Sequence, residues 1–197
     1  MPTIYYIRHG QTEWNALGRF QGSKDIPLND LGRTQATHAG KVLKDLLARD
    51  NRTHRDVAFV ASPLGRARNT MELVRAQLDV PHRDYALDDR LREIGFGDWE
   101  GLTLAEQKAD HPELFAARLT QKWTLPAPGG ESYVQVQERM RVWAAELAGD
   151  TVAVAHGGTC RALMVALGID TPDGVSELPI RQGAVYVFSE DGLETVA

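Results

Sequence analysis

Cysteine is almost absent from the sequence: Cys160 is the single one among 197 residues. One cysteine cannot build an internal disulfide framework, and it cannot supply a cysteine-based zinc site. No metal-ligand motif such as HExxH is present. We therefore expect neither a metal nor another cofactor. Cys160 falls in a predicted helix, where we expect it to serve packing.

The chain also lacks long hydrophobic segments and an excess of positive charge. No apolar stretch approaches the roughly 18 residues that cross a membrane. Arg8 interrupts the apolar run near the N-terminus, so no signal peptide is indicated. The net charge of −5 argues against general binding to nucleic acid or a membrane surface, although it permits a small basic pocket. The expected location is the cytoplasm.

No repeat, low-complexity segment or linker divides the chain. Its length suits one ordinary domain, and its 43% apolar and 25% charged residues are typical of a globular protein with a sizeable core. We expect a single domain over residues 1–197, present as a monomer or a homodimer.

Short apolar runs alternate with helical patterns along the chain. Strands are predicted at 4–7, 57–61, 85–91, 151–155 and 184–188. A first helix is predicted from Asn29 or Asp30 to about Ala48, and a second begins after Ser62, its N-cap, with Pro63 in the first position. Further helices are predicted at 103–123, with a break near Pro112, at 131–147, and after the glycines that follow His156, to about Leu167. Residues 10–30 read as a long irregular loop. This alternation predicts an α/β fold, a three-layer α/β/α arrangement with a mostly parallel central sheet.

The first strand ends abruptly in Arg8-His9-Gly10. The glycine allows a sharp turn, so a histidine and an arginine stand at the carboxyl end of a strand, where open α/β sheets bind ligands. The arginine fork matches phosphate, and a neutral imidazole can accept a phosphoryl group as a nucleophile.

Two further strands carry similar groups at the same position. Arg66 falls in the first turn of the helix after 57–61, and His156-Gly157-Gly158 follows 151–155. Taken alone, Arg66 would read as a solvated helix charge. Because the carboxyl ends of parallel strands share one edge, however, two histidines, two arginines and several backbone N–H groups are predicted to converge on a phosphoryl group. The histidines His38, His54, His82 and His111 lack this context.

With these residues the sequence resembles the histidine phosphatase superfamily, also called phosphoglycerate-mutase-like, over nearly the whole chain. The matching residues are Arg8-His9-Gly10-Gln11-Thr12 with Asn15; Gln21-Gly22 with Asp25, Pro27-Leu28 and Gly32; Ser62-Pro63-Leu64 with Arg66-Ala67 and Thr70; Leu91-Arg92-Glu93 with Gly97 and Trp99-Glu100-Gly101; Pro128-Gly129-Gly130-Glu131-Ser132; and His156-Gly157-Gly158.

The resemblance implies a metal-independent phosphatase in which His9 becomes phosphohistidine and Glu93 protonates the leaving oxygen. Glu100 competes for the acid role, but Glu93 occupies the family position. The other implied phosphate- or substrate-binding residues are Arg8, Arg66, His156, Asn15, Gln21, Gly22 and Gly157. Arg8 and Arg66 should lower the pKa of His9, whereas nearby phosphate charge and Trp99 should raise that of Glu93.

Three functions remain open at this point. The first is a phosphatase acting on a small phosphorylated metabolite, the second a cofactor-dependent phosphoglycerate mutase, and the third a non-catalytic phospho-ligand-binding module. Mutases of the family are expected to be longer than this chain, whose segment 99–128 is compact. Substrate specificity is expected in 10–30 and 99–130. The cations available for a second anionic group are Arg19, Lys24, Lys108 and Lys122.

Overall fold

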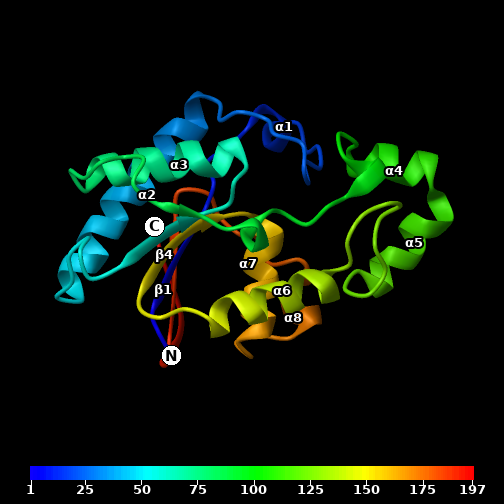
Figure 1. Ribbon diagram of the computed structural model, residues 1–197. Coiled ribbons are helices and arrows are strands. Elements are labelled where there is room, and N and C mark those ends of the chain that lie inside the picture. The colour runs from blue at the N-terminus through cyan, green and yellow to red at the C-terminus, as the bar shows by residue number, and fades with distance from the viewer.

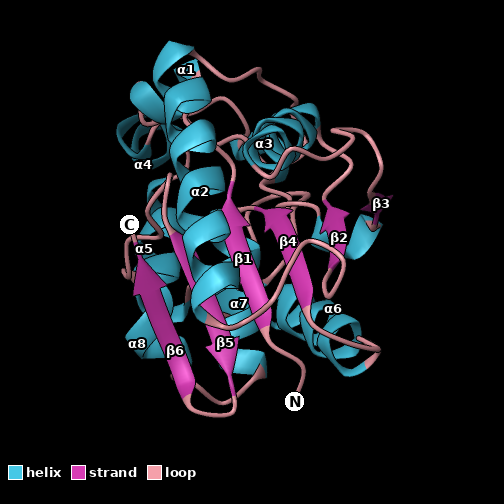
Figure 2. Cartoon of the chain, turned by 90° about the vertical axis from the view of Figure 1, so that its left-hand side faces the viewer, coloured by secondary structure: helices cyan, strands magenta, loops and turns pink.

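The computed structural model describes residues 1–197 and contains a six-stranded sheet between two layers of helices (Figures 1 and 2). The strand order is β3-β2-β4-β1-β5-β6. Strands β3, β2, β4 and β1 are parallel, and β5 and β6 run antiparallel to their neighbours. The strands are β1 (Ile4–Arg8), β2 (Ala58–Ala61), β3 (Ala86–Leu87), β4 (Thr151–Ala155), β5 (Val185–Ser189) and β6 (Gly192–Val196). The predicted three-layer, mostly parallel architecture is confirmed.

Both faces of the sheet are covered because side chains alternate along each strand. In β1, Tyr5 and Ile7 pack in one core, under α2 (Asp30–Arg49) and α3 (Gly65–Gln77). Ile4 and Tyr6 pack in the other core, with buried residues of three further helices. These helices are α6 (Tyr133–Ala145), α7 (Gly157–Ala166) and α8 (Pro172–Ser176). Cys160 is fully buried in this second core, which fits the packing role expected for it.

Two helices lie apart from the sheet, at one end of the molecule (Figure 1). They are α4 (Leu104–Asp110) and α5 (Pro112–Gln121), and they meet at the predicted break before Pro112. Proline lacks the N–H that a continuous helix would need there. None of the helices combines the length and apolar character required to span a membrane.

The start of α3 differs from the prediction. The helix begins at Gly65 instead of Pro63, and its N-cap residue, Leu64, makes no side-chain capping bond. Asp25 supplies the cap from a distant loop, because its carboxylate accepts hydrogen bonds from Gly65 N at 2.8 Å and Arg66 N at 3.4 Å. Ser62 Oγ keeps a long contact from Leu64 N, at 3.4 Å, and has a closer partner described below.

Three other segments were predicted only in part. The expected strand at 85–91 shrinks to β3 followed by the 3₁₀ helix η1 (Asp89–Leu91), where the Asp88 side chain accepts from Arg90 N. The sequence interpretation missed β6, which forms a hairpin with β5. The loop at 10–30 contains one short helix, α1 (Glu13–Ala16), and a second 3₁₀ turn, η2 (Gly97–Trp99), lies before α4.

Candidate active site

A cavity of about 190 Å³ lies at the carboxyl ends of the parallel strands. The predicted site residues that line it are Arg8, His9, Asn15, Gln21, Gly22, Arg66, Glu93 and Gly157. The remaining predicted residue, His156, is fully buried, and its ring centroid lies 5.1 Å from that of His9. The structure therefore brings the whole predicted set together.

His9 is held in one tautomer by the backbone. Its Nδ1 lies 2.7 Å from the carbonyl oxygen of Gly10, and a carbonyl can only accept, so Nδ1 carries the proton. Nε2 is then the nitrogen with a free lone pair. The pKa of His9 is well below the usual 6.5, first because the ring is buried and then because Arg66 and Arg8 repel a positive charge. The predicted lowering is confirmed, with burial as the larger cause.

His156 is fixed through the residue that the sequence interpretation had assigned as a helix cap. Its Nε2 lies 2.8 Å from Ser62 Oγ, whereas its buried Nδ1 has no partner in the protein. Burial, and then the charge of Arg66, holds the pKa of His156 well below 6.5. His156 is therefore a neutral ring with one buried nitrogen left for a further hydrogen bond.

The two arginines bring positive charge into this buried site. Arg8 donates to the carbonyl oxygen of Ile180 at 2.6 Å, and Arg66 donates to those of Lys24 and Gly22 at 2.6 and 2.8 Å. The nearest carboxylate to Arg66 is Asp25, at 3.9 Å, and Arg8 forms no ion pair. Both Nε atoms are buried without an acceptor. Buried charges with incomplete compensation favour a bound anion.

The two glutamates considered as acids have different surroundings. Glu93 lines the cavity, and its Oε1 accepts from Ile94 N and Gly158 N, each at 3.0 Å. Glu100 does not line the cavity. It accepts from Ser23 N at 2.9 Å and Ser23 Oγ at 2.8 Å, and from Phe96 N at 3.2 Å, so it ties two loops together.

The backbone next to the Glu100 carboxylate requires a glycine at position 22. Its φ of +52° lies in the left-handed region, and a Cβ there would come within 2.0 Å of Glu100 Oε1. The same residue presents its carbonyl oxygen to Arg66. Glu100 and Gly22 together therefore position an arginine of the site.

The polar residues of the α1 loop are held by one another. Asn15 Oδ1 accepts from Thr12 N at 3.1 Å and from Gln182 Nε2 at 3.0 Å. Gln21 Oε1 accepts from Thr12 Oγ1 at 3.0 Å. The loop thus presents fixed amide groups at the cavity wall.

Most cations expected to meet a second anion are unsuitable. Arg19 lines the cavity but pairs with Glu106 at 2.9 Å, and Lys122 pairs with Glu177 at 2.9 Å. Lys24 and Lys108 are exposed and do not line the cavity. The sequence interpretation missed Arg161, which lines the cavity and has no ion-pair partner. The signal was its spacing of four residues from Gly157, which puts both on one helix face.

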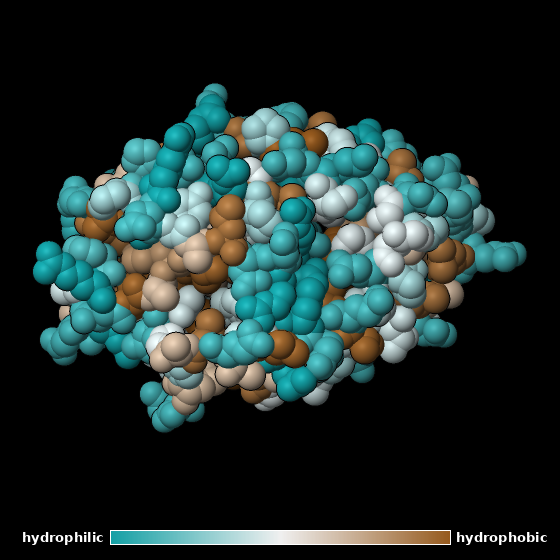
Figure 3. All heavy atoms as spheres, in the orientation of Figure 1, coloured by the Kyte–Doolittle hydropathy of each residue, from teal (hydrophilic) through white to brown (hydrophobic).

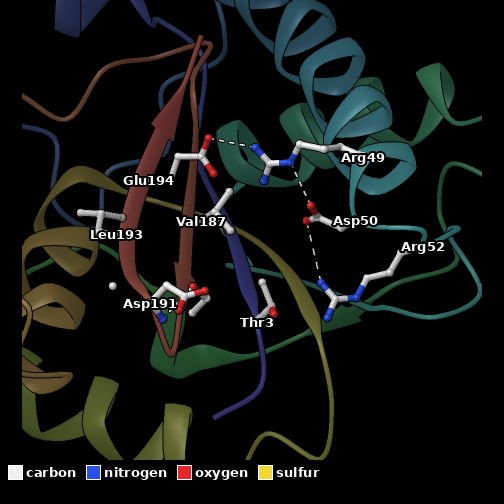
Figure 4. Close-up of a pocket in the computed structure, with 10 residues that line it drawn as sticks. Thr3, Arg49, Asp50, Arg52, Val187, Asp191, Leu193 and Glu194 are labelled. Carbon is white, nitrogen blue, oxygen red and sulfur yellow. Dashed lines mark hydrogen bonds and ion pairs between the residues drawn. The ribbon is translucent and has the colours of Figure 1, made fainter.

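A hollow of about 330 Å³ lies at the other end of β1, next to Thr3 (Figure 4). Its charged residues neutralise one another: Arg49 contacts both Asp50 and Glu194 at 2.9 Å, and Arg52 lies 3.9 Å from Asp50. Each arginine of this hollow is therefore paired with a carboxylate and is not available to an anion, although the hollow is larger than the cavity beside His9.

At the carboxyl edge of the parallel sheet, two imidazoles with lowered pKa values lie beside the buried Arg66 and the half-buried Arg8. These groups define an anion site suited to a phosphoryl group. The family model of the histidine phosphatase superfamily (branch 1) matches residues 4–196. The chain belongs to this superfamily, whose members act through phosphohistidine on small phosphorylated metabolites without a metal.

Relatives include both phosphatases and mutases. A glucosyl-3-phosphoglycerate phosphatase of Mycobacterium tuberculosis is 38% identical over 83% of this chain and 74% of its own length. A 2,3-bisphosphoglycerate-dependent phosphoglycerate mutase of Methylocella silvestris is 32% identical over 94% of this chain and 90% of its own. The structure of a mycobacterial glucosyl-3-phosphoglycerate phosphatase with VO3 superposes with a TM-score of 0.80 at 32% identity, covering 99% and 96% of the two chains.

The length argument against a mutase is not supported by these relatives. This chain spans 90% of the Methylocella mutase and 74% of the mycobacterial phosphatase, so total length does not separate the two activities among these relatives.

The lowered pKa values of His9 and His156 predict a loss of stability in acid. Below pH 6.5 these two histidines bind protons in the unfolded chain but not in the folded protein. The contribution of the two neutral histidines to stability is therefore present above pH 6.5 and is lost as pH falls from 6.5 toward their lowered pKa values. Each histidine contributes up to about 1.4 kcal/mol per pH unit to this slope. The free energy of unfolding, measured with urea at several pH values between 7 and 5, should change less steeply with pH in His156→Gln than in wild type. His82→Gln, at an exposed position, should keep the wild-type dependence on pH. Equal slopes in all three proteins would contradict the assignment.

Proposed function

We propose that the protein is a phosphomonoester phosphatase that acts on a small phosphorylated metabolite through a phosphohistidine at His9. The observation that carries this proposal is the state of His9, whose pKa is lowered by burial and by the charges of Arg66 and Arg8, and whose Nδ1 carries the proton. Such an imidazole is ready to attack phosphorus through Nε2.

In the first step, His9 Nε2 forms a bond to phosphorus while the bond to the substrate oxygen breaks. Glu93 delivers its proton to that oxygen, because an alkoxide leaves poorly without one. In the second step, the Glu93 carboxylate takes a proton from water, whose oxygen attacks the phosphohistidine. Inorganic phosphate leaves, and both His9 and Glu93 return to their starting states.

The remaining residues stabilise charge on the transferring group. A phosphoryl group in transfer spreads its charge over equatorial oxygens, so a ring of donors lowers the barrier. We assign this role to Arg8, Arg66 and His156, whose buried Nε and Nδ1 atoms lack partners in the protein. Further contacts to substrate or phosphate are assigned to Asn15, Gln21, Gly22 and the N–H of Gly157.

Several broader features belong to the same proposal. We propose one domain, 1–197, that works in the cytoplasm as a monomer or homodimer, without a metal and without binding nucleic acid.

Replacing His9 by Ala tests the nucleophile. The variant should lose more than a factor of about ten in kcat, which corresponds to more than roughly 1.4 kcal/mol, because no other group can form the covalent intermediate. Phosphate release from a panel of phosphomonoesters measures the loss. A coupled assay for phosphoglycerate mutase activity, run beside it, tests the alternative reaction that the mutase relatives suggest. A His9→Ala enzyme retaining a tenth of wild-type kcat would refute the assignment.

Replacing Glu93 by Gln tests the acid. Single-turnover phosphoryl transfer from an alkyl phosphate should slow far more than transfer from p-nitrophenyl phosphate, since p-nitrophenolate leaves without a proton. Glu100→Gln is the matched control: it loosens the two loops and should affect both substrates alike. If Glu93→Gln slowed both substrates equally while Glu100→Gln discriminated between them, the acid would be Glu100.

A further inference from the structure

A second cavity, of about 350 Å³, adjoins the one beside His9. The two share four wall residues: Phe20, Phe96, Tyr133 and Arg161. The rest of the second cavity is formed mainly by η2, α4 and α5, the helices that stand apart from the sheet (Figure 1). A substrate held at His9 by its phosphoryl group can therefore extend the rest of its structure into this space, which we call the side groove.

The side groove is mostly apolar. Seven of its twelve lining residues are hydrophobic, and Phe20 meets Phe96 edge to face with ring centroids 4.6 Å apart. Two of the lining residues are large apolar side chains exposed to solvent: Leu104 of α4 is 57% exposed and Leu119 of α5 is 71% exposed. Figure 3 shows apolar atoms among hydrophilic ones at this end of the molecule. An exposed apolar surface that continues from a binding site indicates a ligand surface.

Two of the three cations that line the side groove are already engaged. Lys122 Nζ lies 2.9 Å from Glu177 and donates to the carbonyl oxygen of Ser176 at 2.6 Å. Arg118 donates to the carbonyl oxygen of Leu125 at 2.8 Å, and its guanidinium lies 5.1 Å from the ring centre of Trp99. Glu177, the partner of Lys122, also lines the groove and is its one carboxylate. Arg161, at the junction with the first cavity, is the one lining cation here with neither a carboxylate nor an aromatic face as partner.

We propose that the side groove binds the alcohol part of the substrate, and that this alcohol is largely apolar or aromatic. The inference rests on the phosphatase function proposed above. A pocket with aromatic walls and few polar groups selects an apolar body, while the adjoining site fixes the phosphoryl group.

The test compares ethyl phosphate with 3-phenylpropyl phosphate, two esters of primary alcohols that differ in the apolar body. Wild-type kcat/KM should be at least about tenfold higher for the phenylpropyl ester, because a hydrophobic pocket discriminates by that order. The double variant Leu104→Ser/Leu119→Ser should lower this ratio threefold or more. Both positions are exposed, so folding should be retained. Leu31→Ser, at a leucine of α2 that is 51% exposed and lines neither cavity, should keep the wild-type ratio.

The outcomes separate the two proposals. The phosphatase function is refuted if none of the phosphomonoesters, including p-nitrophenyl phosphate, shows phosphate release that depends on His9, as judged by its loss in His9→Ala. If p-nitrophenyl or ethyl phosphate is hydrolysed but the phenylpropyl ester is no better than ethyl phosphate, the function stands and the side-groove inference is overturned. A preference for 3-phosphoglycerate over the phenylpropyl ester, or a ratio unchanged by the double variant, overturns it equally.

Discussion

The guanidinium groups of Arg66, which is buried, and of Arg8, which is half-buried, are the feature on which the site depends. The nearest carboxylate to Arg66 is 3.9 Å away, and Arg8 forms no ion pair. Burial, and then the positive charges of Arg66 and Arg8, hold the pKa values of His9 and His156 well below 6.5. The same positive charges are not fully compensated within the protein, so they favour binding of an anion in the cavity. One arrangement thus prepares the nucleophile and attracts the group that it attacks.

This charge is held in place by the backbone more than by other side chains. Arg8 and Arg66 donate to carbonyl oxygens of Ile180, Lys24 and Gly22, which hold a guanidinium without neutralising it. The loop that carries Gly22 is tied down by Glu100, and the helix that carries Arg66 is capped by Asp25. Residues outside the cavity therefore decide where the positive charge lies.

The convergence of Arg8-His9, Arg66 and His156 could be predicted from sequence because strand ends are local features. Each buried strand was recognisable as an apolar run, and a parallel sheet places the carboxyl ends of its strands at one edge. Arg66 was found for a partly wrong reason: the predicted cap at Ser62 is absent, and Asp25 caps the helix instead. Ser62 contacts His156, 94 residues away, and no local pattern reveals that.

Long-range pairings account for the other differences. In the sequence, only the family position favoured Glu93 over Glu100. The structure separates them by contacts: Glu93 lines the cavity, whereas Glu100 accepts hydrogen bonds from Ser23 and Phe96. The last strand, β6, is only partly buried and lacks an apolar run. The Lys122–Glu177 pair likewise joins α5 to α8 across the chain, so the availability of that lysine could not be predicted from spacing.

The measurement that tests the central claim most directly is trapping of the phosphoenzyme. Wild-type protein mixed with p-nitrophenyl phosphate is quenched in alkali, which preserves phosphohistidine, then digested and mapped by mass spectrometry. We expect the phosphoryl group on the peptide that contains His9, at that residue, and none on the same peptide of His9→Ala. A burst of p-nitrophenolate without modification of His9, or a phosphoryl group found on His156 or on a carboxylate, would contradict the account.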